Sequence, residues 1–192
     1  GDSSMEANTT VASNVDIGED ALKANTTGGS NVAIGATALD ANTTASSNTA
    51  VGAASMSANT TGSQNTALGF NSLPLNTTGT GSTAIGYQAL LSNTTGTNTG
   101  IGYQALYSNT TGTSNTSVGL NSGFSATTGD QNTYLGISAG ENVTGGSHNT
   151  LIGANAGDAA NIGSTTAVGH DCLTSVTGDE NTAIGEAALQ SV

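Results

Sequence analysis

The most constraining feature of the sequence is a glycine that recurs at an almost fixed interval along the whole chain. Successive copies are 16 or 17 residues apart, and an isoleucine, valine or leucine precedes each of them. A fixed period over the full length is typical of a small structural unit stacked on copies of itself. We therefore predict a single repeat domain over residues 1–192. The repeat glycines are Gly18, Gly35, Gly52, Gly69, Gly86, Gly102, Gly119, Gly136, Gly153, Gly169 and Gly185.

Each repeat contains a segment of the type Asn-Thr-Ala-Ile-Gly, in which β-branched residues alternate with small or polar ones. This alternation predicts a short β-strand, with the threonine and the aliphatic residue on one face and the asparagine and the small residue on the other. A following pair such as Ala89-Leu90 predicts a second short strand. Asn-Thr-Thr-Gly segments predict tight turns, in which Asn and Gly would supply the positive backbone dihedrals.

Two short strands and two turns in about 17 residues make one coil of a β-solenoid. The predicted fold class is therefore all-β: one solenoid of about eleven 16–17-residue coils, stacked about 4.8 Å apart into a rod about 50 Å long. We expect the aliphatic column to be buried and the stacked asparagines to hydrogen-bond amide to amide. A column of small residues, which includes Cys172, is expected where walls approach closely. Because aromatic residues are only 3% of the chain, the core is thin, and burial between chains would supplement it.

The charge of the chain limits the classes of partner that it can bind. Thirteen acidic residues oppose one basic residue, which gives a net charge of −12, and no charged residue lies between Asp40 and Asp130. Such a chain repels phosphate backbones and anionic lipid surfaces, which argues against nucleic-acid and membrane partners. No apolar run approaches the roughly 18 residues of a membrane span, so no membrane insertion is expected.

No group of residues predicts catalysis. His148 and His170 occupy different columns of the repeat, and the neighbouring Asp171 and Cys172 have no second ligand pair at a spacing that suits a metal. The acidic residues do not recur in one column. We therefore expect no catalytic residues, no metal, no cofactor and no enzymatic activity.

One surface candidate is the column that immediately follows the repeat glycine. On five consecutive coils it is aromatic or aliphatic, which predicts an apolar stripe about 20 Å long. Such a stripe is either a subunit interface or covered groove, or a platform for a receptor or sugar, and both interpretations stand. Its residues are Phe70, Tyr87, Tyr103, Leu120 and Ile137.

A second candidate is the Asn-Thr-Thr sequence at the turns, which matches the N-glycosylation sequon. Turn chemistry explains the asparagine equally well without a glycan. Threonines in register on a flat face also raise the possibility of ice binding. The candidate glycosylation sites are Asn25, Asn59, Asn76, Asn93 and Asn109.

The repeats resemble the head repeats of trimeric autotransporter adhesins, whose motif centres on a Ser/Asn-x-Ala-Ile-Gly strand. The closest copies are Ser82–Leu90, Asn98–Leu106 and Asn181–Leu189, and the likeness runs from about Asn14 to Leu189. The longer form with Asn-Thr-Thr-Gly turns also resembles repeats of phage tail-fibre proteins and related bacterial tail-fibre-domain proteins. The resemblance implies a left-handed parallel β-roll, a homotrimer, and an elongated surface fibre that presents or forms an adhesive tip.

These observations together predict a non-enzymatic structural or adhesive segment of a longer fibre protein. It would be the shaft or head of a surface adhesin or phage tail fibre, located outside the cell, on a cell surface or on a virion, and would attach to a host or surface. One alternative is a monomeric β-solenoid that binds ice or polysaccharide through one flat face. A third interpretation is a glycan-coated structural filament protein.

Overall fold

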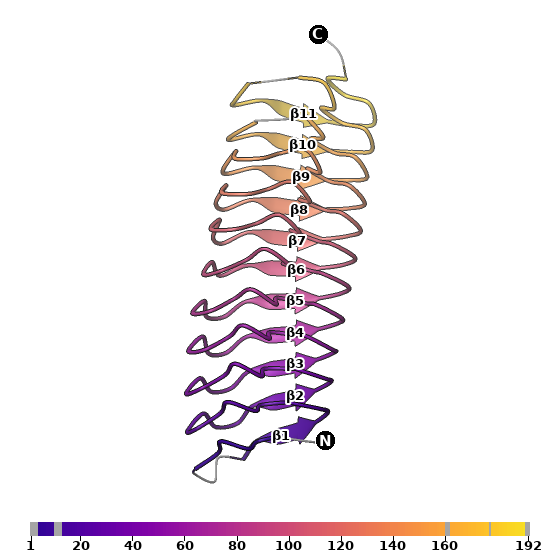
Figure 1. Ribbon diagram of the computed structural model, residues 1–192. Helices are drawn as coiled ribbons and strands as arrows, with labels where there is room; N and C mark the ends of the chain where they lie inside the picture. The colour runs from indigo at the N-terminus through magenta and orange to yellow at the C-terminus, as the bar shows by residue number, and fades with distance from the viewer. Residues whose placement is uncertain (1–3, 10–12, 160–161, 177, 191–192) are drawn as a thin grey trace.

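The computed structural model describes residues 4–9, 13–159, 162–176 and 178–190. Over these residues the protein is an all-β parallel solenoid of about ten turns without a helix (Figure 1). Eleven strands form one sheet in sequence order: β1 Val15–Ile17, β2 Val32–Ile34, β3 Thr49–Val51, β4 Thr66–Leu68, β5 Thr83–Ile85, β6 Thr99–Ile101, β7 Thr116–Val118, β8 Thr133–Leu135, β9 Thr150–Ile152, β10 Thr166–Val168 and β11 Thr182–Ile184.

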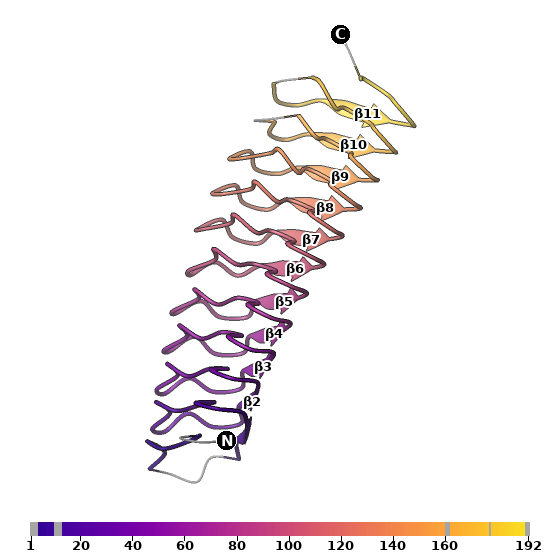
Figure 2. The ribbon, with the colours of Figure 1, turned by 45° about the vertical axis from the view of Figure 1, so that its right-hand side comes forward.

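Equivalent residues of successive repeats lie directly above one another. Thr83 of β5 pairs with Thr99 of β6, and Ile85 pairs with Ile101, in a parallel register that recurs between all neighbouring strands. Figure 2 shows the same coils stacked into an elongated rod, with the N-terminus at one end and β11 near the other. The prediction of a stacked solenoid with like residues in vertical columns is confirmed.

Within the described residues each coil contains one three-residue strand, so the predicted second strand is wrong. The Ala-Leu pair lies in a turn instead, and the leucine adopts a left-handed backbone, with φ of 53° at Leu90 and 52° at Leu106. The residue two positions earlier is also left-handed, as at Gln88, where φ is 55°. This conformation costs a non-glycine residue about 1–2 kcal/mol, and it persists because the surrounding coils hold the chain in place.

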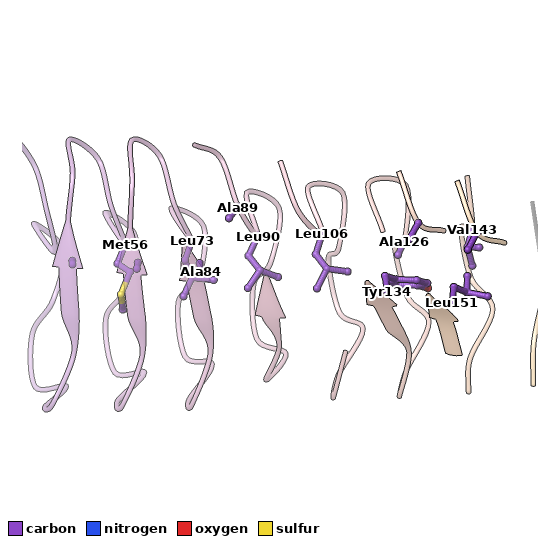
Figure 3. Packing of buried hydrophobic residues seen from close by; sticks show 14 of the residues in the cluster. Met56, Leu73, Ala84, Ala89, Leu90, Leu106, Ala126, Tyr134, Val143 and Leu151 are labelled. Atoms are coloured by element: carbon purple, nitrogen blue, oxygen red, sulfur yellow. The ribbon is translucent and has the colours of Figure 1, made fainter. Parts of the chain in front are cut away.

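The core is a narrow column along the inside of the coils. The central strand residue points inward, as do the Ala and Leu of the turn, and Ala84, Ala89 and Leu90 are all 0% exposed. Figure 3 shows Met56, Leu73, Leu90 and Leu106 repeating in one line along the rod. Each of these coils therefore contributes one large apolar side chain and a few small ones to the interior.

Three coils rearrange this core. A glycine replaces the turn leucine at Gly123, Gly140 and Gly157, and the large side chain comes from the strand centre instead, as Tyr134 or Leu151. A Cβ atom on Gly123 would lie 2.6 Å from the Tyr134 ring, and one on Gly140 would lie 2.5 Å from it. The glycines therefore make room for a residue contributed by the opposite wall.

The aliphatic column before the repeat glycine points outward, so the expectation that it is buried is wrong. Ile17 is 58% exposed, Leu68 46% and Ile184 72%. Strand alternation fixes only that neighbouring residues face opposite ways. In this fold the alanine side faces the core, where the turn leucine supplies the large side chain.

Buried asparagines link the coils in two columns. At the turns the bonds run amide to amide: Asn42 Nδ2 donates to Asn25 Oδ1 (2.8 Å), and Asn59 Nδ2 donates to Asn42 Oδ1 (3.0 Å). In the column before the strand, the backbone N–H of Asn48 donates to Asn31 Oδ1 (2.9 Å). The predicted asparagine column before the strand is therefore held mainly by side chain to backbone bonds.

Glycine is required by close packing as well as by dihedral angle. Gly35 has φ of 135°, and a Cβ on it would lie 2.5 Å from the carbonyl carbon of Gly52 in the next coil. The turn glycine Gly28 is different: its φ is not positive, but a Cβ there would lie 2.5 Å from Asn25 Oδ1. The positive dihedral near this turn belongs to Ser30, with φ of 58°, and not to the asparagine or glycine as predicted.

Candidate functional site

The outer face of the sheet is a regular surface that runs over all eleven strands. It consists of the first and third residues of each strand, which point away from the core, and we call it the outer sheet face. The first residue is threonine in the nine strands from β3 to β11, and the third is always isoleucine, valine or leucine. The third residues are exposed or half-buried on every strand. An aliphatic column therefore runs beside a threonine column along the whole rod.

The five residues of the predicted apolar stripe lie on consecutive coils and are all exposed. Their exposed fractions lie between 42% for Tyr87 and 58% for Ile137. The backbone holds the column in register, because the N–H of Gln88 donates to the Phe70 carbonyl (3.0 Å) and that of Gln104 donates to the Tyr87 carbonyl (2.9 Å). We call this column the aromatic stripe: Phe70, Tyr87, Tyr103, Leu120 and Ile137.

The rings of the aromatic stripe stack on one another. The Phe70 and Tyr87 centroids are 5.5 Å apart with an interplanar angle of 16°, and those of Tyr87 and Tyr103 are 5.2 Å apart at 7°. Both faces of the Tyr87 ring are therefore turned to neighbouring rings. At Tyr87 the stripe therefore presents a ring edge and a hydroxyl group to a partner, and not an open ring face.

Amide side chains run beside the rings. An amide residue directly follows each of the first four residues of the stripe. Between two neighbouring coils, Gln104 Nε2 donates to Gln88 Oε1 (2.8 Å). Within the described part of the chain, the hydroxyls of Tyr87 and Tyr103 have no hydrogen bond to another residue. The neighbouring amides are those of Asn71, Gln88, Gln104 and Asn121.

A second aromatic stack escaped the sequence analysis. Tyr107 and Phe124 are half-buried, with centroids 4.9 Å apart and an interplanar angle of 9°. Both lie five residues after a repeat glycine, Gly102 and Gly119. An alignment of the repeats on their glycines would have shown that the two rings occupy the same position on consecutive coils.

The candidate glycosylation sites are inside the coil. All five asparagines are 0% exposed. The amide nitrogens of Asn25, Asn59 and Asn93 donate to the carbonyl of the glycine three residues later, at 2.9–3.0 Å. A glycan on these nitrogens would need the space that the coil itself occupies, so turn chemistry explains the asparagines at Asn25, Asn59, Asn76, Asn93 and Asn109.

The titratable residues are scattered along the rod. Burial raises the pKa of Asp158, whose Oδ1 accepts from Asn142 Nδ2 at 2.8 Å. His170 Nδ1 lies 3.4 Å from the Asp171 carboxylate, while His148 lies by Asp179 at an open hollow of about 510 Å³. Cys172 is buried as a small core residue. Among the described residues, no three His, Cys, Asp or Glu side chains gather into a group that could hold a metal.

The described part of the chain contains no helix with the length and hydropathy of a membrane span. Comparison with known proteins finds no family model that matches the chain, and no curated protein or solved structure with significant similarity to it. What the structure itself establishes is a parallel β-solenoid of tandem repeats of about 17 residues, the architecture of a repeat β-roll.

Proposed function

We propose that the chain is a non-enzymatic segment of a structural and adhesive fibre, in which several copies pack side by side through the outer sheet face. The rod would form the shaft or head of a surface adhesin or phage tail fibre. It would act outside the cell, on a cell surface or a virion, and attach that particle to a host or surface.

The observation that carries this proposal is the outward aliphatic column, from Ile17 of β1 to Ile184 of β11. Apolar side chains scattered singly over a surface need no explanation, but a continuous exposed column is typical of a contact with another protein. Strand alternation keeps these side chains on the face opposite the core. Packing against a second copy is the way in which the whole column can leave water.

The shape of the molecule favours a fibre over a globular binding domain. The eleven strands form an elongated rod in which each coil contacts only its neighbours (Figure 2). Such a rod extends by adding coils and can present a surface along its entire length. The resemblance of the Ser82–Leu90 and Asn98–Leu106 repeats to adhesin heads favours three as the number of copies.

The mass of the native protein tests this proposal. Size-exclusion chromatography with multi-angle light scattering is expected to give three times the 18.5 kDa of one chain. A mass of 18.5 kDa at micromolar concentration would contradict assembly through the outer sheet face.

A second candidate function uses the same face in a single chain. The threonines of β3 to β11 pair in register, which gives a regular array of hydroxyl and methyl groups. An array of this kind favours an ordered ligand such as ice or a polysaccharide. A monomer that lowers the freezing point of water below its melting point would support ice binding and contradict the fibre.

A further inference from the structure

The aromatic stripe covers fewer coils of the rod than the outer sheet face does. The outer sheet face is aliphatic on all eleven strands, whereas the column of the stripe is large and apolar only from Phe70 to Ile137. Nearer the two ends the same column is small or charged, as at Ala53, Ala154 and Glu186. A contact between copies along the whole rod explains the first surface. It does not explain rings that are confined to the middle coils.

Charge defines what kind of partner the stripe can meet. Phe70, Tyr87, Tyr103 and Leu120 all lie in the segment between Asp40 and Asp130, which contains no charged residue. An anionic partner would be repelled by the acidic remainder of a chain of net charge −12. A cationic partner would find its counter-charges at the ends of the rod and none beside the rings. The local chemistry therefore suits an uncharged partner.

The stripe also offers hydrogen-bonding groups at regular intervals. Tyr87 is 42% exposed and Tyr103 48%, and their hydroxyls make no hydrogen bond within the described chain. The amides of Gln88 and Gln104 occupy the adjacent column and bond to each other, which fixes their position beside the rings. Each amide group keeps further donor or acceptor capacity after that one bond. A ring edge, a hydroxyl and an amide thus occur together on the two neighbouring coils of Tyr87 and Tyr103.

We propose that the aromatic stripe binds a neutral polysaccharide that lies along the rod. A sugar chain combines apolar C–H surface with hydroxyl groups, and the stripe combines apolar rings and aliphatic side chains with two tyrosine hydroxyls and a row of amides. The C–H groups would contact the ring edges and Leu120, and the hydroxyls would bond to the tyrosines and glutamines. This inference rests on the proposed adhesive function, because it names the class of surface to which the fibre attaches.

Affinity electrophoresis of the intact protein tests the inference. Native gels would contain dextran, mannan, galactan, xylan or β-glucan, with polygalacturonate and heparin as anionic comparisons. At least one neutral polysaccharide is expected to retard the protein, and neither anionic one is. The variant Tyr87→Ala/Tyr103→Ala is expected to weaken the binding about tenfold or more.

The second aromatic stack supplies the matched control. Tyr107→Ala/Phe124→Ala removes two stacked rings from another column of the same region and is expected to leave the binding unchanged. Equal weakening by both double variants, or no retardation by any neutral polysaccharide, would overturn the inference.

Light scattering on the same samples separates this inference from the proposed function. A native mass unchanged by Tyr87→Ala/Tyr103→Ala is expected. A fall to the mass of one chain would make the stripe a subunit interface and overturn its role in sugar binding. A wild-type monomer that still binds polysaccharide through the stripe would instead contradict the oligomer and leave this inference standing.

Discussion

At the scale of single residues, the repeat glycine meets two requirements that can be separated. Its φ lies in a range that L side chains rarely adopt, and its missing side chain lets the next coil approach. Gly52, with φ of 133°, has the carbonyl carbon of Gly69 2.6 Å from the place where a Cβ would lie. Gly185 has a similar φ of 125°, but no atom lies within 4 Å of its Cβ position. The first requirement holds in every coil, and the second only where another coil follows.

Substitution of these two glycines is therefore expected to differ in cost. Gly185→Ala carries only backbone strain, about 1–3 kcal/mol at most. Gly52→Ala adds a backbone clash and is expected to lower the free energy of unfolding by more than about 3 kcal/mol. Chemical denaturation of the two variants measures the difference. An equal loss of unfolding free energy in the two variants would mean that contact with the next coil is not a reason for glycine at this position.

At the scale of the coil, large side chains can come from either wall of the solenoid. Most coils use the turn leucine, while the coils around Tyr134 use the strand centre and have Gly123 and Gly140 at the turn. Burial raises the pKa of Tyr134, whose hydroxyl makes no hydrogen bond within the described chain. The ring is therefore held by apolar packing alone, and it is the glycines that make this packing possible.

Because the large side chain can come from either wall, leucines at Gly123 and Gly140 are expected to change the free energy of unfolding in opposite directions with and without Tyr134. Tyr134→Ala is expected to cost about 3–5 kcal/mol of unfolding free energy, since it leaves a cavity between two glycines. Adding Gly123→Leu and Gly140→Leu to that variant is expected to recover about 1–3 kcal/mol. In the wild-type background the same two leucines are expected to destabilise the protein, because they collide with the ring. Thermal or urea denaturation of the four proteins checks the cycle, and stabilisation by the leucines in both backgrounds would contradict it.

The sequence predicts the stacking of coils well, because the 16–17-residue period can be read without knowing the backbone conformation within a coil. It does not tell which side of the strand faces inward. Ile85 and Ala84 alternate, and hydrophobicity alone favours the larger residue for the core, whereas in the structure Ala84 is buried beside Leu90. The left-handed conformation of Leu90 is also hidden, because leucine has no intrinsic preference for it and neighbouring coils impose it. Aligning the repeats on their glycine predicts the aromatic stripe, which directly follows that glycine. The same alignment of the residues five positions after the glycine would also have predicted the Tyr107–Phe124 stack.

At the scale of the whole molecule, the rod has a closed, well-bonded interior and an apolar exterior column. The interior needs no partner, since the asparagine bonds, the core leucines and the parallel sheet all lie within one chain. In the proposed fibre the outer sheet face does need one, because its aliphatic column would otherwise stay in water along the full length. Assembly through this face is therefore expected to depend on the aliphatic residues and to be insensitive to the turns.

The most direct test is the native mass of a variant with charge introduced into that face. Ile85→Lys/Ile101→Lys places two lysines on adjacent strands of the outer sheet face, whereas Thr61→Lys/Thr78→Lys adds the same charge at exposed turn positions. Light scattering is expected to give a trimer for the wild type and the turn variant, and a mass of 18.5 kDa for the outer-face variant. A trimer that survives the outer-face lysines, or a wild type that is already a monomer, would contradict assembly through this surface.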